Sequence, residues 1–203
     1  MTAPSDLRIP RVPVGSEKLI QEGAVSYVQA TIAMNQFKKI VLDVCEDLAK
    51  GHLEGINKMM GTNFTEEDVR PYPQKGKLLV TEDPWMYVSF NLNDVVEIYI
   101  GLYWKPQDDT YQLHAITAMW FSDQKLFQKA WQKFDENRDL KFKTFPYDEK
   151  AKHITLSEAI PQGQATAFPE KLQTVLDGFL EGWEKIGGLI KLMEDVAKAQ
   201  QSK

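Results

Sequence analysis

The spacing of apolar residues changes along the chain and divides it into helical and extended segments. Between residues 16 and about 60, apolar residues recur every three or four positions, which predicts one long helix followed by a short or kinked one. Between residues 77 and 121 the period becomes two, and this predicts an antiparallel β-meander. From 169 to about 199 the steps alternate between four and three, the heptad spacing of a long C-terminal helix.

The turn inside the meander follows from the alternation on either side of it. Even-numbered residues carry the apolar side chains both before Leu92 and after Val96. For both sets to reach one face of the sheet, the numbers of facing residues must sum to an even number. We therefore expect Leu92 to face Val96 across a three-residue loop, residues 93–95.

The remaining pattern completes an α+β fold. A third strand over 111–121 leads into a helix capped by Ser122, and a pair of short strands follows at about 140–145 and 153–156. The element order αβββαββα predicts an antiparallel β-meander sheet of about five strands, packed against long N- and C-terminal helices. We expect residues 16–203 to form a single α+β domain.

Both ends of the chain leave alternatives open. Residues 1–15 hold three prolines among apolar residues, which predicts an extended N-terminal arm that lies on its own domain or on a partner subunit. The C-terminal heptad pattern pairs with residues 25–60 of the same chain, which we prefer, or forms a homodimer. Within it, Gly187 and Gly188 mark either a kink or a close approach of another backbone, and we favour the close approach.

Composition narrows the classes of function. The 203 residues include 24 basic and 29 acidic side chains, a net charge of -5, so nucleic acid and anionic membranes are unfavourable partners. The one cysteine, Cys45, lies on the apolar stripe of the first helix and cannot form an intramolecular disulfide. With three histidines in distant segments we expect no metal site, and no motif indicates a cofactor. The absence of a signal peptide or a membrane-spanning run predicts a cytoplasmic protein.

No standard catalytic motif is present, so the candidate site rests on one face of the meander. Tyr and Trp alternate there with polar residues, a composition typical of recognition surfaces and pockets. Either a long helix covers this face, or it forms a groove for a ligand or peptide. The residues that we expect to bind there are Trp85, Tyr87, Glu97, Tyr99, Tyr103, His114 and Trp120.

Two functions fit such a face. The one that we favour is a non-enzymatic intracellular binding protein, such as an adaptor, an inhibitor or immunity-like protein, or a chaperone, that binds another protein or a peptide. The alternative is a small-molecule hydrolase or transferase with a pocket on the same face. His114 would then be the acid or base, and Glu97 would orient it. The absence of catalytic motifs favours the first function.

Overall fold

A computed structural model describes residues 16–72, 85–107, 110–145 and 148–201. The predicted N-terminal arm, residues 1–15, lies outside these ranges. The chain divides into two compact units, Met1–Phe37 and Lys38–Lys203. The first unit is described from Ser16 onward and is helical there, as part of α1 (Glu17–Gly51). The sheet and the candidate site belong to the second unit.

The second unit is built on a six-stranded antiparallel sheet, so the predicted α+β class and the antiparallel meander are confirmed. The sheet has the order β1-β2-β3-β4-β6-β5, one strand more than the expected five. The additional strand, β1, is a short edge strand that pairs with β2 and contains a proline. The strands are β1 (Arg70–Tyr72), β2 (Trp85–Leu92), β3 (Val96–Gln107), β4 (Thr110–Phe121), β5 (Lys143–Thr144) and β6 (His153–Ala159).

The turn between β2 and β3 has the predicted geometry, with Leu92 facing Val96. The backbone N–H of Val95 donates to the carbonyl of Leu92 at 2.9 Å. Asn93 and Asp94 have positive φ angles of 50° and 57°, which short polar side chains tolerate better than most others. The loop therefore keeps the even-numbered residues of β2 and β3 on one face of the sheet.

The helices of the described residues are α1, α2 (Leu53–Met60), α3 (Gln124–Asn137), α4 (Phe168–Lys185) and α5 (Gly188–Gln201). The predicted long helix followed by a short one is confirmed by α1 and α2. The expected cap of α3 is wrong by one residue. Asp123 is the N-cap, because its carboxylate accepts the N–H of Leu126 at 2.7 Å, whereas the Ser122 hydroxyl donates to a carbonyl of the β2–β3 turn.

The single long C-terminal helix predicted from the heptad pattern is wrong, because the helix breaks between α4 and α5. Gly187 and Gly188 both have positive φ angles, 84° and 76°. A Cβ atom on Gly188 would lie 2.9 Å from the carbonyl oxygen of Met59 in α2. The glycine pair therefore combines the two alternatives, a change of helix direction and a close approach of another backbone.

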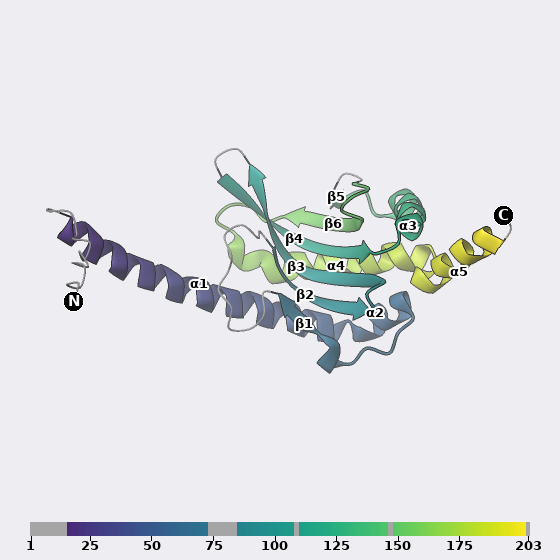
Figure 1. Ribbon diagram of the computed structural model, residues 1–203, viewed down its shortest axis with the longest axis horizontal. Helices are drawn as coiled ribbons and strands as arrows, with labels where there is room; N and C mark the ends of the chain where they lie inside the picture. Colours follow the sequence, from purple (N-terminus) through teal and green to yellow (C-terminus); the bar gives the residue numbers. More distant parts are fainter. Residues whose placement is uncertain (1–15, 73–84, 108–109, 146–147, 202–203) are drawn as a thin grey trace, which may run out of the picture. The chain divides into compact units, whose positions relative to one another are not determined.

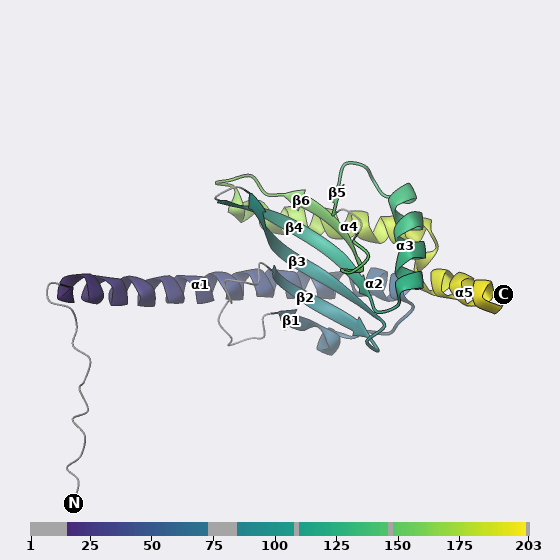
Figure 2. The ribbon, with the colours of Figure 1, turned by 45° about the horizontal axis from the view of Figure 1, so that its top comes forward.

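The core lies between one face of the sheet and the helices. Figures 1 and 2 show α4 running behind the sheet. Cys45 is buried in this core, as predicted, and burial raises the pKa of its thiol. No helix of the described ranges is both long enough and apolar enough to cross a membrane. Fully buried core residues include Val41, Cys45, Val88, Ile98, Ile100, Met119, Leu176, Phe179 and Trp183.

Candidate functional site

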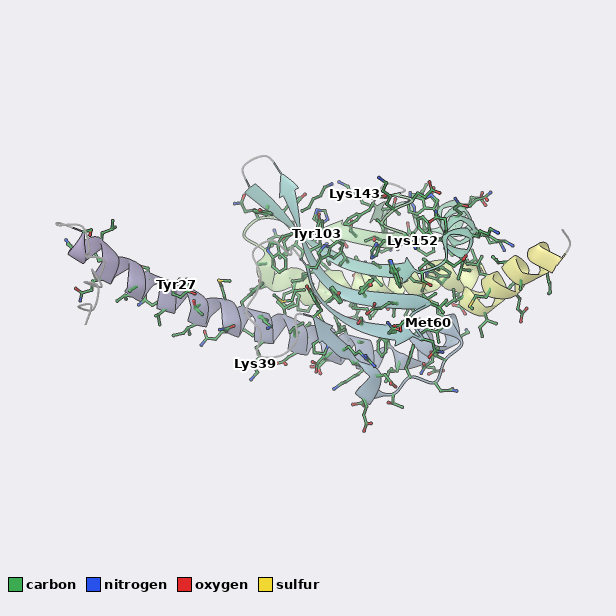
Figure 3. The ribbon with its side chains drawn as sticks, viewed as in Figure 1. Tyr27, Lys39, Met60, Tyr103, Lys143 and Lys152 are labelled. Atoms are coloured by element: carbon green, nitrogen blue, oxygen red, sulfur yellow. The ribbon has the colours of Figure 1, made fainter. Side chains whose placement is uncertain are left out.

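The candidate site is the sheet face opposite the core, which we call the open face. The register aligns its residues in rows across the strands: Asn91, Glu97, Trp120 and His153 form one row, and Trp85, Tyr103, His114 and Ala159 form another. All seven predicted binding residues lie on this face, and one of them, Tyr103, is labelled in Figure 3. Among the described residues the helices that build the core pack on the other face, so the alternative of a covering helix is not met there.

Aromatic rings form two packed groups on the open face, which together we call the aromatic layer. The ring centroids of Trp85 and Tyr103 are 4.3 Å apart, and those of Tyr87 and Tyr99 are 4.7 Å apart in an edge-to-face arrangement. Tyr72 of β1 stacks on Tyr87 at 4.9 Å. Such ring pairs add stability beyond the area that they bury. The layer is therefore a packed surface rather than a set of separate side chains.

A hollow of about 270 Å³ opens in this layer. It is lined by Tyr72, Trp85, Tyr87, Tyr99 and His153. On β3, the position between Tyr99 and Tyr103 is Gly101, which contributes no side chain to the face. A Cβ atom at Gly101 would lie only 2.1 Å from the carbonyl oxygen of Met86, so β2 approaches β3 more closely here than any other residue allows.

Glu97 lies beside the hollow and is connected to it by Tyr99. The Tyr99 hydroxyl donates to the Glu97 carboxylate at 3.1 Å. Burial and then the Glu97 charge raise the pKa of Tyr99, so its hydroxyl stays protonated as the donor. Within the described ranges no lysine or arginine forms an ion pair with Glu97, which is half-buried. Among the described side chains, the Glu97 carboxylate therefore has a neutral hydroxyl as its hydrogen-bond partner.

His114 lies at the other end of the open face and is only 3% exposed. Its Nε2 atom is 3.3 Å from the Gln112 side-chain oxygen, and its Nδ1 atom has no hydrogen-bond partner within the described part of the chain. Burial lowers the pKa of His114, and the charges of Lys105 and Lys143 lower it further. The imidazole is therefore neutral at pH 7, and the charges around it are positive.

The expected pairing of His114 with Glu97 is not found. Glu97 faces Trp120 across the β3–β4 ladder, whereas His114 faces Tyr103, six positions further along β3. At about 3.3 Å per residue the two side chains are separated by roughly 20 Å. Alternation correctly placed both residues on one face, but they lie in different rows.

Sequence reasoning missed three residues of the site. His153 faces Trp120 across the β4–β6 ladder, and its ring lies 5.7 Å from that of Tyr99. Burial lowers the pKa of His153, so this histidine is also neutral at pH 7. Phe145 adds a ring 5.3 Å from Tyr103, and Tyr72 adds one from β1. The sequence predicted a strand over 153–156, which includes His153. The pairing register of β4 with β6 could not be predicted from the local pattern of residues.

A second hollow, of about 630 Å³, lies between α2 and α4. Two side-chain pairs cross it. Lys58 donates to Glu184 at 2.6 Å, and the His52 Nε2 atom is 3.0 Å from an Asp177 oxygen. These pairs join the two helices, so the polar side chains of this hollow have a structural role. The aromatic residues of the open face have no comparable contacts with a helix among the described residues.

Comparisons with known proteins do not extend this description, since no family model, no curated protein and no solved structure matches the chain.

Proposed function

We propose that this chain is a non-enzymatic binding protein whose open face holds an extended segment of another protein. The observation that carries the proposal is the aromatic layer, which is roughly 20 Å long at about 3.3 Å per residue from the Glu97 row to the Tyr103 row. This is the length of about six extended residues. A small molecule would occupy only a part of such a surface.

The charges at the two ends of the layer favour a peptide of defined direction. Glu97 lies at one end, without a basic partner among the described residues. Lys105 and Lys143 lie near His114 at the other end. A segment with a basic side chain at one end and an acidic side chain at the other would complement both. Tyr and Trp between the ends supply large, rigid contact areas.

The proposed binding is compatible with each form of the favoured function, because an adaptor, an inhibitor and a chaperone all bind a partner chain. We place the protein in the cytoplasm, where a single buried thiol such as that of Cys45 stays reduced. The enzyme alternative is weaker, because its acid-base residue and its orienting carboxylate lie in different rows. A carboxylate orients a histidine only when the two groups lie within hydrogen-bond distance.

Selection from a random peptide library tests the proposal. We expect wild-type protein to enrich peptides of six or more residues with apolar or aromatic centres. The variant Tyr103→Leu removes a ring from the layer and should weaken the binding of the selected peptides at least tenfold, which is typical of an anchoring tyrosine in an interface. Tyr27→Leu is the matched control, because Tyr27 is 69% exposed and lies in the other unit of the chain.

Thermal unfolding of each variant shows whether it remains folded. The proposal is overturned if folded wild-type protein enriches no peptide, or if the enriched peptides bind Tyr103→Leu as tightly as wild type. Binding that is weakened equally by Tyr27→Leu would also overturn it, because the open face would then not be the contact surface.

A further inference from the structure

We infer that the hollow between Tyr72, Trp85, Tyr87, Tyr99 and His153 is a binding site for an alkylammonium group, carried by a lysine side chain of the partner segment. The assignment of the ammonium group to a partner chain rests on the proposed function. It concerns the chemistry of one position within the open face.

The composition of the lining favours a cation. Four of the five lining residues are Tyr or Trp, and the faces of these rings carry negative electrostatic potential. The fifth, His153, has a pKa lowered by burial and is neutral at pH 7. The described part of the lining therefore contains no positive charge that would repel an ammonium group.

Glu97 adds a full negative charge next to the hollow. Its carboxylate accepts the hydroxyl of Tyr99, which is itself a lining residue. This hydrogen bond makes the Tyr99 ring more electron-rich and so strengthens its attraction for a cation. In the described part of the chain Glu97 forms no ion pair, so its carboxylate can pair with an incoming ammonium.

Basic residues near the open face do not fill this role. Arg70 of β1 faces Ser89 and interacts with Asp68. Lys152 donates to the Ser122 carbonyl and lies 5.8 Å from the ring of Trp120. Lys143 and Lys105 act on His114, in the row at the other end of the layer. Among the described residues, the lining rings and Glu97 thus lie apart from the two lysines that act on His114.

The experiment compares ligands that differ only in charge. Isothermal titration of the full chain with choline chloride and with 3,3-dimethylbutan-1-ol, its neutral carbon analogue, measures the contribution of the cation. We expect choline to bind about tenfold more tightly, since cation–π contacts in partly desolvated sites are of this size. Equal affinities would overturn the inference, because the hollow would then be merely apolar.

Three variants locate the binding. Glu97→Gln keeps the shape and removes the charge, and should lower the affinity for choline about fivefold without changing that for the alcohol. Tyr99→Leu removes a ring and should lower it further. Glu181→Gln, an exposed glutamate on α4, is the matched control and should have no effect. An unchanged affinity in Glu97→Gln would overturn the role of the carboxylate and with it the inference.

A second pair of ligands identifies the source of the ammonium. N-acetyl-lysine methylamide and its Nε-trimethylated derivative should both bind if the hollow takes a lysine side chain, the trimethylated form at least as tightly as choline. Binding of choline without binding of the lysine derivatives would overturn the partner-lysine assignment. Because these ligands do not depend on the peptide selection, a failed selection with successful choline binding would refute the proposed function and leave the ammonium site standing.

Discussion

Gly101 connects the fold with the site, and its replacement by alanine tests how closely β2 and β3 approach. A Cβ atom there would lie 2.1 Å from the Met86 carbonyl oxygen and 2.5 Å from the Tyr87 Cα atom. Both contacts are with backbone, so rotation of a side chain cannot relieve them. In a strand without such contacts, alanine would stabilise the protein by about 0.5–1 kcal/mol relative to glycine. The close approach therefore decides the sign of the effect.

We expect Gly101→Ala to lower the free energy of unfolding by about 2 kcal/mol, within the range of overpacked cores. For a chain of this size, that corresponds to a Tm lower by about 4–8 °C. Gly51→Ala makes the same chemical change where no atom lies within 4 Å, and should raise the free energy of unfolding by up to about 1 kcal/mol. Urea titration monitored by circular dichroism measures both variants.

The two glycine variants should therefore change stability in opposite directions. If Gly101→Ala is neutral or stabilising, β2 does not approach β3 as closely as described. The folded fraction of Gly101→Ala should also bind choline more weakly than wild type, because displacement of β2 moves two of the lining rings.

Three further predictions concern the rest of the molecule. Gly187→Ala and Gly188→Ala both place alanine at a positive φ angle, which costs about 1–2 kcal/mol of unfolding free energy. Of the two, only Gly188 lies against the backbone of α2, so Gly188→Ala should unfold at a lower urea concentration than Gly187→Ala. Equal urea midpoints for the two variants would contradict the close approach of α2. Because folding lowers the pKa of His114 and of His153, the unfolded chain binds more protons near pH 6 than the folded chain does. The free energy of unfolding should therefore be highest above pH 7 and decrease as the pH falls below 6.5. Urea titrations from pH 7.5 to 5.5 that show no decrease would contradict the described burial of these histidines. Asp123→Ala should cost about 1 kcal/mol of unfolding free energy through the lost N-cap, whereas Asp123→Ser should cost little.

Local patterns predicted the parts of the fold that depend on local physics. The parity of apolar residues fixed the Leu92–Val96 pairing, because a shift by one residue would have turned every side chain of a strand to the other face. The same parity placed the predicted binding residues on one face. The helix break at Gly187 and Gly188 was not predictable in this way, because the heptad pattern continues through it and the reason for the break lies in α2.

The composition of the site could be predicted only in part for a related reason. Alternation assigns a residue to a face, but only the pairing of strands assigns it to a row. His153 joins the Glu97 row through β4–β6 pairing, which brings together residues that are distant in sequence. Tyr72 was missed because Pro71 argues against a strand, although an edge strand tolerates proline. Thus the two lining residues that complete the hollow came from non-local pairing.

The aromatic layer serves the stability of the sheet as well as the proposed binding. Ile116, Ala118 and Thr155 are fully buried although they belong to the open face. A variant that removes a ring removes packing contacts from this face, so it lowers the unfolding free energy and the affinity together. Glu97→Gln does not share this ambiguity, because the amide keeps the volume of the carboxylate and can still accept the Tyr99 hydroxyl. A loss of choline affinity in this variant, at unchanged Tm, would therefore measure the charge alone.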